Sequence, residues 1–209
     1  MSMRRSKAYV QICVAAFAAS LMASPLSAAT PAQKPEDLVR LRDTMRCVAT
    51  RAPRATSETL DSDFREQPAY ARKMQRLMDT NKTCFSASTM RARGVIVPGF
   101  LAEAQLAAIG GTDPVRAIAY RSELPPIAAR DAAEVIALCA VRAKPAEVRA
   151  LFDTAPGSAE EKAALAPVVS AVGTCTPTAT QARFNRPGLR AVLALAYRRI
   201  ANHNRGSAS

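Results

Sequence analysis

Cysteines are the residues whose type and spacing most directly indicate chemistry in this sequence. Five occur: Cys13 lies in an apolar N-terminal run, and the others are Cys47, Cys84, Cys139 and Cys175. An even number of cysteines in an exported chain is typical of disulfides, and four cysteines allow three connectivities. A zinc site is the alternative, but zinc sites usually use closely spaced cysteine pairs, which this sequence lacks.

Two aspartates, Asp61 and Asp153, are each followed by a hydroxyl residue, Ser62 or Thr154. A facing pair of carboxylates could share a proton or bind a cation. The alternative is that each aspartate ends or caps its own helix. We expect the local role, and we therefore predict no catalytic residue.

Basic residues form the other group that could bind a ligand. An anion-binding surface could be formed by Arg91, Arg93, Arg183, Arg186, Arg190, Arg198 and Arg199. Tyr197 would be available for stacking on such a surface. The alternative is that these arginines form the solvated face of alanine-rich helices. Aromatic residues make up only 5% of the chain, so we expect no specific nucleic-acid binding.

Several classes of active site lack their required residues. The sequence contains one histidine, His203, which argues against Ser-His-Asp and Cys-His arrangements and against zinc sites built from several imidazoles. It has no C-x-x-C pair and no glycine-rich phosphate loop. We predict no cofactor and no metal, although enzymes with paired carboxylates need no histidine.

Residues 1–29 have the layout of a cleavable export signal. A short basic stretch precedes an uncharged apolar run over residues 8–23, and small residues lead up to Ala29. Sixteen helical residues span roughly 24 Å, less than the roughly 30 Å of a membrane hydrocarbon core. A membrane anchor and a lipoprotein are the alternatives, but Cys13 lies too early for lipid attachment. We predict cleavage after Ala29, and no transmembrane segment in the mature chain.

The net charge of the chain is strongly positive. It is +12, and the predicted signal removes three basic residues and no acid, which leaves +9. Such an excess favours anionic partners but does not determine a fold. Outside the cytoplasm, the available anions include lipid head groups, cell-wall polymers, acidic proteins and released nucleic acid.

The sequence also contains two similar halves of about 90 residues. Cys84 follows Cys47 by 37 residues, and Cys175 follows Cys139 by 36. The matches, in order, are Pro53 with Pro145, Leu60-Asp61-Ser62 with Phe152-Asp153-Thr154, Thr83 with Thr174, and LAEA at 101–104 with LALA at 193–196. We infer a tandem duplication in which each copy closes its own bridge, pairing Cys47 with Cys84 and Cys139 with Cys175.

Apolar spacing predicts an all-α fold. Pro35 and two acids begin the first helix, whose apolar stripe is Leu38, Leu41, Met45 and Val48. Pro53 and Pro145 each restart the chain in a second helix. Residues 158–161 read as a capping box for a helix that directs Leu165, Val168, Val169 and Val172 inward.

The last helix of each half differs in polarity. Residues 99–109 are apolar almost all round, which predicts a buried helix at the centre of the fold. In the second half, residues 189–200 carry an apolar face, and Arg190, Arg198 and Arg199 are expected to lie off it. We predict a first repeat over 30–111, a linking helix and turn over 112–130, a second repeat over 131–200, and a disordered tail over 201–209.

The repeated units resemble those of small secreted proteins of alphaproteobacteria, for which no activity is assigned. The shared elements are a cysteine, an R-x-P or x-K-P step, a capped helix, a second cysteine and a closing L-A-x-A helix. Here they are Cys47, Arg51, Pro53, Cys84 and LAEA, then Cys139, Lys144, Pro145, Cys175 and LALA. The resemblance covers residues 36–200 and implies a fold and export only.

Two classes of function follow from these observations. The first is a non-catalytic periplasmic or secreted interaction module, whose basic face binds a protein or an anionic envelope component. The alternative is a carboxylate-based envelope hydrolase that uses Asp61 and Asp153. We expect the interaction module.

Overall fold

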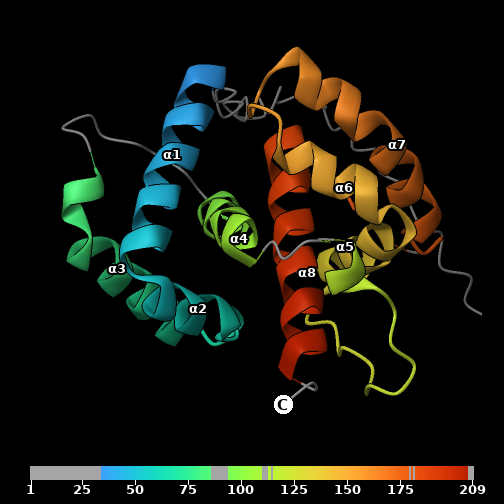
Figure 1. Ribbon diagram of the computed structural model, residues 1–209, viewed down its shortest axis with the longest axis horizontal. Helices are drawn as coiled ribbons and strands as arrows, with labels where there is room; N and C mark the ends of the chain where they lie inside the picture. Colours follow the sequence, from blue (N-terminus) through green and yellow to red (C-terminus); the bar gives the residue numbers. More distant parts are fainter. Residues whose placement is uncertain are drawn as a thin grey trace, which may run out of the picture. The chain divides into compact units, whose positions relative to one another are not determined.

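The computed structural model describes residues 34–85, 94–109, 113, 115–178, 180 and 182–206. These all belong to one compact unit that spans residues 33–209. The predicted signal over 1–29, Arg91 and Arg93 lie outside the described residues. Within the described part, the structure has eight α-helices, two short 3-10 helices and no strand (Figure 1), so the predicted all-α class is confirmed.

The helices fall into two groups of four along the chain. The first group is α1 (Pro35–Arg51), α2 (Pro53–Asp61), α3 (Ala69–Thr80) and α4 (Ile96–Ile109), with η1 (Lys82–Cys84) after α3. The second group is α5 (Ala132–Ala143), α6 (Pro145–Phe152), α7 (Ala159–Cys175) and α8 (Arg186–Gly206). The turn η2 (Arg116–Ile118) lies between the two groups.

Helix boundaries follow the local sequence signals. Pro35 stands in the first turn of α1, followed by two acids, which suit the positive end of the helix dipole. Asp131 accepts a hydrogen bond from the Glu134 amide at the start of α5. Ser158 accepts one from the Glu161 amide at the start of α7, as the capping box predicts.

The break between the first two helices has the same backbone conformation in both groups. Ala52 has φ −132° and ψ 59°, and Lys144 has φ −137° and ψ 58°. Each is followed by a proline, Pro53 or Pro145, in the first turn of the next helix. Because proline lacks an N–H and has a fixed φ, it is well suited to begin a helix at this break.

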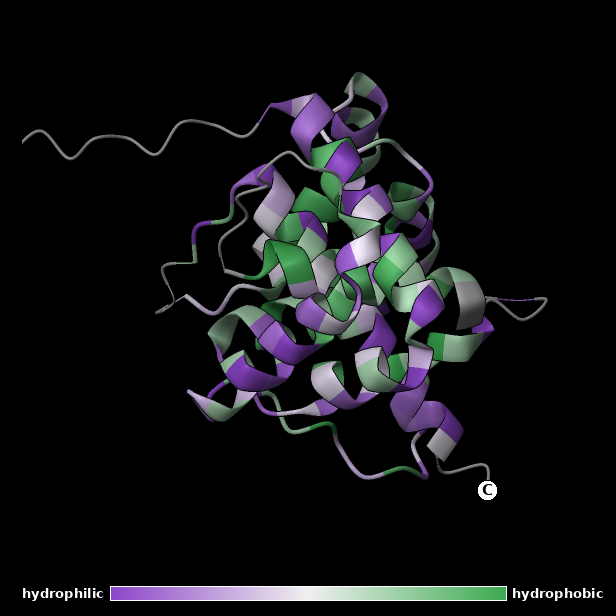
Figure 2. Ribbon diagram, turned by 90° about the vertical axis from the view of Figure 1, so that its left-hand side faces the viewer, coloured by the Kyte–Doolittle hydropathy of each residue, from purple (hydrophilic) through white to green (hydrophobic). Residues whose placement is uncertain are grey.

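The core lies around α4, which packs against α8 on one side and α1 on another (Figure 1). Apolar residues gather in the interior between the helices, as the hydropathy colours show (Figure 2). The predicted stripe of α1, Leu38, Leu41, Met45 and Val48, is buried there. The prediction of a buried central helix is therefore confirmed.

Gly99 allows α4 and α8 to approach closely. A Cβ atom placed on Gly99 would lie 2.3 Å from the Cβ and 2.5 Å from the Cα of Ala191. Contacts this short cannot occur, so the two backbones meet where neither helix carries a bulky side chain. The packing of the two closing helices depends on this pair of small residues.

Both predicted disulfides are present. Cys47 bonds Cys84, and Cys139 bonds Cys175. Each bridge joins the first helix of a group to the end of its third helix or the turn that follows. Disulfides persist in oxidising compartments, so the two bonds suggest an extracytoplasmic environment. None of the described helices is long and apolar enough to cross a membrane.

Four pairs of helices correspond between the two groups. In the first, α1 packs on α2 and α4, and α2 packs on α3 and α4. In the second, α5 packs on α6 and α8, and α6 packs on α7 and α8. The second group also has an extensive contact of α5 with α7, whereas, in the described part of the chain, α1 contacts η1 and has no comparable contact with α3. The two groups meet at α4 and α8.

Three local expectations were wrong. The described part of residues 112–121 holds the short turn η2 and extended chain rather than a linking helix. The tail is helical through Gly206, because Ala201 and Asn204 are buried and Asn204 donates hydrogen bonds to the carbonyls of Ala117 and Ala119. Val169, expected to face inward, is 52% exposed.

Candidate functional site

Arg190 lies inside the protein rather than on its surface. Its side chain is 1% exposed, and it donates two hydrogen bonds of 2.8 Å to the carboxylate of Glu103 on α4. It also donates one of 3.1 Å to Glu161 on α7. Burial alone would lower the pKa of Arg190, but the two carboxylates outweigh it, so its pKa is raised above its ordinary value. Arg190 therefore joins the two groups of helices internally.

Arg198, two turns further along α8, is also buried, with its side chain 3% exposed. It donates hydrogen bonds of 2.7 Å to Asp61 at the end of α2 and 2.5 Å to Gln105 on α4. Among the described residues, no atom accepts a hydrogen bond from its Nη2. A buried guanidinium nitrogen without an acceptor is costly. Nη2 has almost no solvent-exposed surface, so a ligand reaches it only if neighbouring side chains move.

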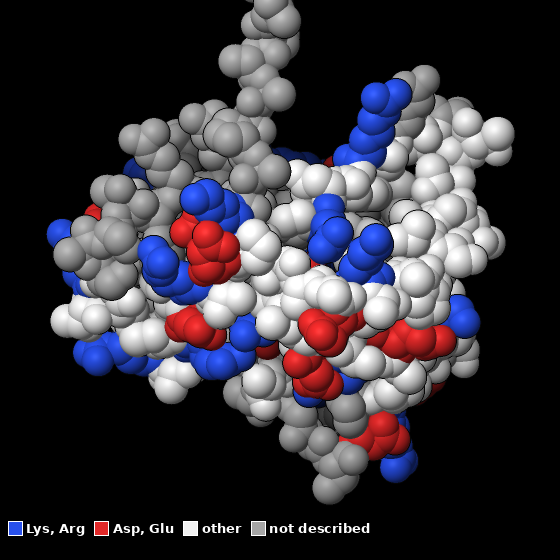
Figure 3. All heavy atoms as spheres, turned by 90° about the horizontal axis from the view of Figure 1, so that it is seen from above, with Lys and Arg blue, Asp and Glu red and all other residues white. Residues whose placement is uncertain are grey.

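These positions correct the expected anion-binding surface. Arg190 and Arg198 were expected to lie off the buried face of α8, but both are buried because carboxylates on neighbouring helices pair with them. Arg183 and Arg186 are exposed, and their role in anion binding stays a prediction. On the face seen in Figure 3, Lys and Arg are interspersed with Asp and Glu instead of forming a continuous basic area.

The two aspartates do not share a site. Asp61 pairs with Arg198, whereas Asp153 accepts a hydrogen bond of 2.8 Å from Arg149 within its own helical turn. Asp153 lines a small cavity of about 90 Å³ beside Arg42 and Arg46, and Asp61 lines other hollows. Asp153 is therefore engaged within its own helix, as expected, whereas Asp61 pairs with a distant helix instead of acting only locally.

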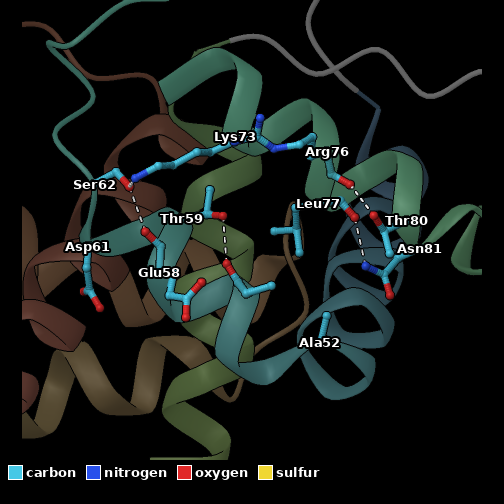
Figure 4. A pocket seen from close by; sticks show the side chains of 11 residues that line it. Ala52, Glu58, Thr59, Asp61, Ser62, Lys73, Arg76, Leu77, Thr80 and Asn81 are labelled. Atoms are coloured by element: carbon cyan, nitrogen blue, oxygen red, sulfur yellow. Dashed lines mark hydrogen bonds between the residues drawn. The ribbon is translucent and has the colours of Figure 1, made fainter. Parts of the chain in front are cut away.

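A groove of about 670 Å³ separates α2 from α3 (Figure 4). Lys73 reaches across it to donate a hydrogen bond of 2.7 Å to Ser62. The hydroxyl groups of Thr59, Ser62 and Thr80 donate to carbonyls of their own helices. Most of its polar groups thus satisfy one another, and nothing in this groove selects a particular ligand.

The side chains of four arginines line a second hollow, of about 400 Å³, which we call the arginine pocket. They belong to Arg65 in the turn after α2, Arg130 before α5, and Arg198 and Arg199 on α8. The rest of the lining is Leu60, Asp61, Asp63, Ala128, Ala129 and Leu195. Both groups of helices therefore contribute to this pocket.

The carboxylates around the arginine pocket are held ionised by their arginine partners. Hydrogen bonds from Arg65 lower the pKa of Asp63 to about 2. Partial burial alone would raise the pKa of Glu134, but hydrogen bonds from Arg130 and Arg199 hold it below the ordinary value of 4.5. The arginine pocket therefore places four guanidinium groups beside four carboxylates, those of Asp61, Asp63, Asp131 and Glu134.

An apolar cleft of about 540 Å³ adjoins the arginine pocket. Three half-buried aromatic side chains line it, those of Phe64, Tyr70 and Phe184. Further apolar lining comes from Val95, Pro98, Ala133, Val192 and Leu195. Burial raises the pKa of Tyr70, so its hydroxyl stays protonated at neutral pH. A half-buried apolar surface of this kind is typical of ligand sites.

The cleft and the arginine pocket share one wall. Leu60, Arg130 and Leu195 line both hollows. At this wall the Arg130 guanidinium carbon lies 4.9 Å from the centre of the Phe64 ring, a cation–π contact. A single molecule could therefore contact the apolar cleft and the guanidinium groups at once.

Sequence reasoning found half of this pocket. It singled out Arg198 and Arg199, but it missed Arg65 and Arg130, which lie far from them along the chain. Arg130 immediately precedes Asp131, which was read only as the start of the next repeat. Among the described residues, no group of three or more His, Cys, Asp or Glu residues could hold a metal ion.

Comparisons with protein-family models, with curated proteins and with solved structures found no match to this chain.

Proposed function

We propose that this protein is a non-catalytic periplasmic or secreted binding protein, and that its arginine pocket binds the anionic group of an envelope component. The proposal depends on one observation: Arg65, Arg130, Arg198 and Arg199 converge in one pocket, and Arg198 keeps a buried donor without an acceptor among the described residues. Guanidinium groups bind carboxylate and phosphate oxygens through short, charge-assisted hydrogen bonds.

The chemistry of the pocket favours an anion over a cation. Asp61, Asp63 and Glu134 already accept hydrogen bonds from an arginine, so none of the three is free to bind a cation. Nη2 of Arg198, by contrast, donates no hydrogen bond to any described residue. An anionic oxygen placed near Nη2 would satisfy a donor that otherwise costs free energy. The concave shape of the pocket suits a small anionic group better than the flat surface of a protein partner.

Export and duplication are part of the same proposal. The two disulfides and the signal-like residues 1–29 support a location in the periplasm or outside the cell. The matching helix contacts and the shared conformation of Ala52 and Lys144 support a tandem origin, as in the secreted proteins that the sequence resembles. On this view, the arginine pocket is built from residues of both copies.

The hydrolase alternative receives no support from the site. A general acid and a base must both reach one substrate, but Asp61 and Asp153 line different hollows and are each paired with an arginine. No observation therefore favours a carboxylate-based reaction in this protein.

Retention of the full chain on immobilised envelope extract at increasing salt tests the proposed function. We expect retention at low salt that weakens as salt rises, and at least a threefold loss of retention in Arg65→Gln. Arg54→Gln is the matched control, because Arg54 is exposed and also pairs with a single carboxylate, Glu58. Equal retention of the two variants, or no salt dependence, would overturn the arginine pocket as the binding site.

A further inference from the structure

We propose that the anionic ligand is a single-chain amphiphile of the fatty-acid type. Its carboxylate would lie in the arginine pocket, and its alkyl chain would lie in the adjoining apolar cleft. This inference rests on the proposed function, because it names the class of anion that the arginine pocket binds.

The first step of the argument is the continuity of the two hollows. Leu60 and Leu195 present apolar surface to both, and Arg130 stands at the junction. A ligand that filled only the arginine pocket would leave the cleft open, and one that filled only the cleft would not contact Arg65, Arg198 or Arg199. A molecule with one charged end and one apolar body fills both hollows.

The second step is the character of the cleft. Three of the ten aromatic residues in the chain, Phe64, Tyr70 and Phe184, line this one cleft, and none of the three is fully buried. Apolar side chains held half-exposed around a hollow of about 540 Å³ are unusual unless something covers them. The volume is within the range of small-ligand sites and suits one alkyl chain.

The third step concerns the charges that face the cleft. Asp131 accepts the amide hydrogen bond that begins α5, and Glu134 is paired with Arg130 and Arg199. Both acids on this side are thus engaged, so neither is free to bind a cationic head group. The basic residues that line the two hollows favour an anionic head group; they are Arg130 and Arg183 at the cleft and Arg65, Arg198 and Arg199 in the arginine pocket.

Calorimetric titration with alkyl carboxylates below their micelle concentrations tests the inference on the full chain. We expect dodecanoate to bind at least tenfold more tightly than octanoate, since each fully buried methylene contributes up to about fourfold in affinity. Dodecanol should bind at least tenfold more weakly than dodecanoate, and dodecyltrimethylammonium should not bind. Equal affinity for octanoate and dodecanoate, or for dodecanoate and dodecanol, would overturn the inference.

Variants of the cleft locate the alkyl chain. Ala133 lines the cleft, whereas Ala132, next to it in the first turn of α5, is exposed and does not. We expect Ala133→Phe to fill the cleft and lower the affinity for dodecanoate at least tenfold, while Ala132→Phe binds like the wild type. If Ala133→Phe does not fold, Phe184→Ala provides the same test, with Phe85→Ala, outside the cleft, as its control.

The results also separate this inference from the proposed function. One outcome is that retention still depends on salt and on Arg65, while alkyl-chain length and Ala133→Phe have no effect on binding. In that case the amphiphile proposal is wrong, and the arginine pocket remains the proposed anion site. If dodecanoate binding is unaffected by Arg65→Gln and by salt, dodecanoate binds without using the arginine pocket, and both proposals fail.

Discussion

Arg190 and Arg198 show how single residues determine the properties of this protein. They stand eight positions apart on α8, and both project into the interior, where acids on other helices bind them. Arg190 contacts the chain at the end of α6, through Phe152 and Thr154, and Arg198 contacts Asp61 at the end of α2. These two helix ends correspond in the proposed duplication.

Replacing Arg190 should destabilise the protein strongly. Arg190→Gln leaves Glu103 and Glu161 buried without their cation, and such a change costs about 3 to 5 kcal/mol in the free energy of unfolding. Arg54→Gln, which breaks an exposed pair, should change it by less than about 0.5 kcal/mol. Urea denaturation of both variants checks this, and a similar small loss in both would show that the buried pairing is energetically unimportant.

Glu134 should make stability depend on acidity. Its pKa is lowered in the folded state, so its contribution is complete above the ordinary value of 4.5 and disappears as the pH falls through the folded pKa. Glu134→Gln should therefore be about 2 to 3 kcal/mol less stable than the wild type at pH 7. Unfolding curves at successively lower pH should show this gap closing, and a constant gap would contradict the assignment.

At the scale of the element, periodicity and capping predicted most of the helices. The apolar stripe of α1, the capping box at Ser158, and the apolar sequence of α4 were sufficient because each is a local signal. The burial of Arg190 and Arg198 was not predictable in this way. It depends on acids from distant parts of the sequence, which only the packing of α8 against its neighbours brings close.

The same reason explains the partial prediction of the site. Arg198 and Arg199 are neighbours in sequence and were identified together, whereas Arg65 and Arg130 reach the pocket through turns that carry no periodic signal. The helical end of the chain was missed because its polar sequence resembles a disordered tail, although Asn204 binds the carbonyls beside η2.

The crossing of α4 and α8 should tolerate no added side chain at Gly99. Gly99→Ala would place a methyl group against the Cα and Cβ of Ala191, and helix displacement of this kind costs about 1 to 3 kcal/mol or more. Gly173→Ala is the control, because a Cβ there meets nothing within 4 Å. Thermal unfolding should show a lower midpoint for Gly99→Ala alone, and equal midpoints would argue against a close crossing.

At the scale of the whole molecule, two disulfide-closed groups of helices meet at α4 and α8. Each bridge closes a loop of nearly forty residues, which the chain-entropy relation values at about 4 kcal/mol. The paired substitution Cys47→Ser with Cys84→Ser should therefore lower the free energy of unfolding by about 2 to 4 kcal/mol, as measured in urea. A loss below about 0.5 kcal/mol would contradict a stabilising role for the bridge.

The central claim is that an anion binds in the arginine pocket, and the NMR signals of the Arg198 guanidinium test it most directly. Titration of the full chain with octanoate should shift the Arg198 side-chain resonances in a saturable, salt-sensitive way, while those of Arg54 stay unchanged. Unchanged Arg198 resonances at octanoate concentrations that shift other residues would contradict the claim.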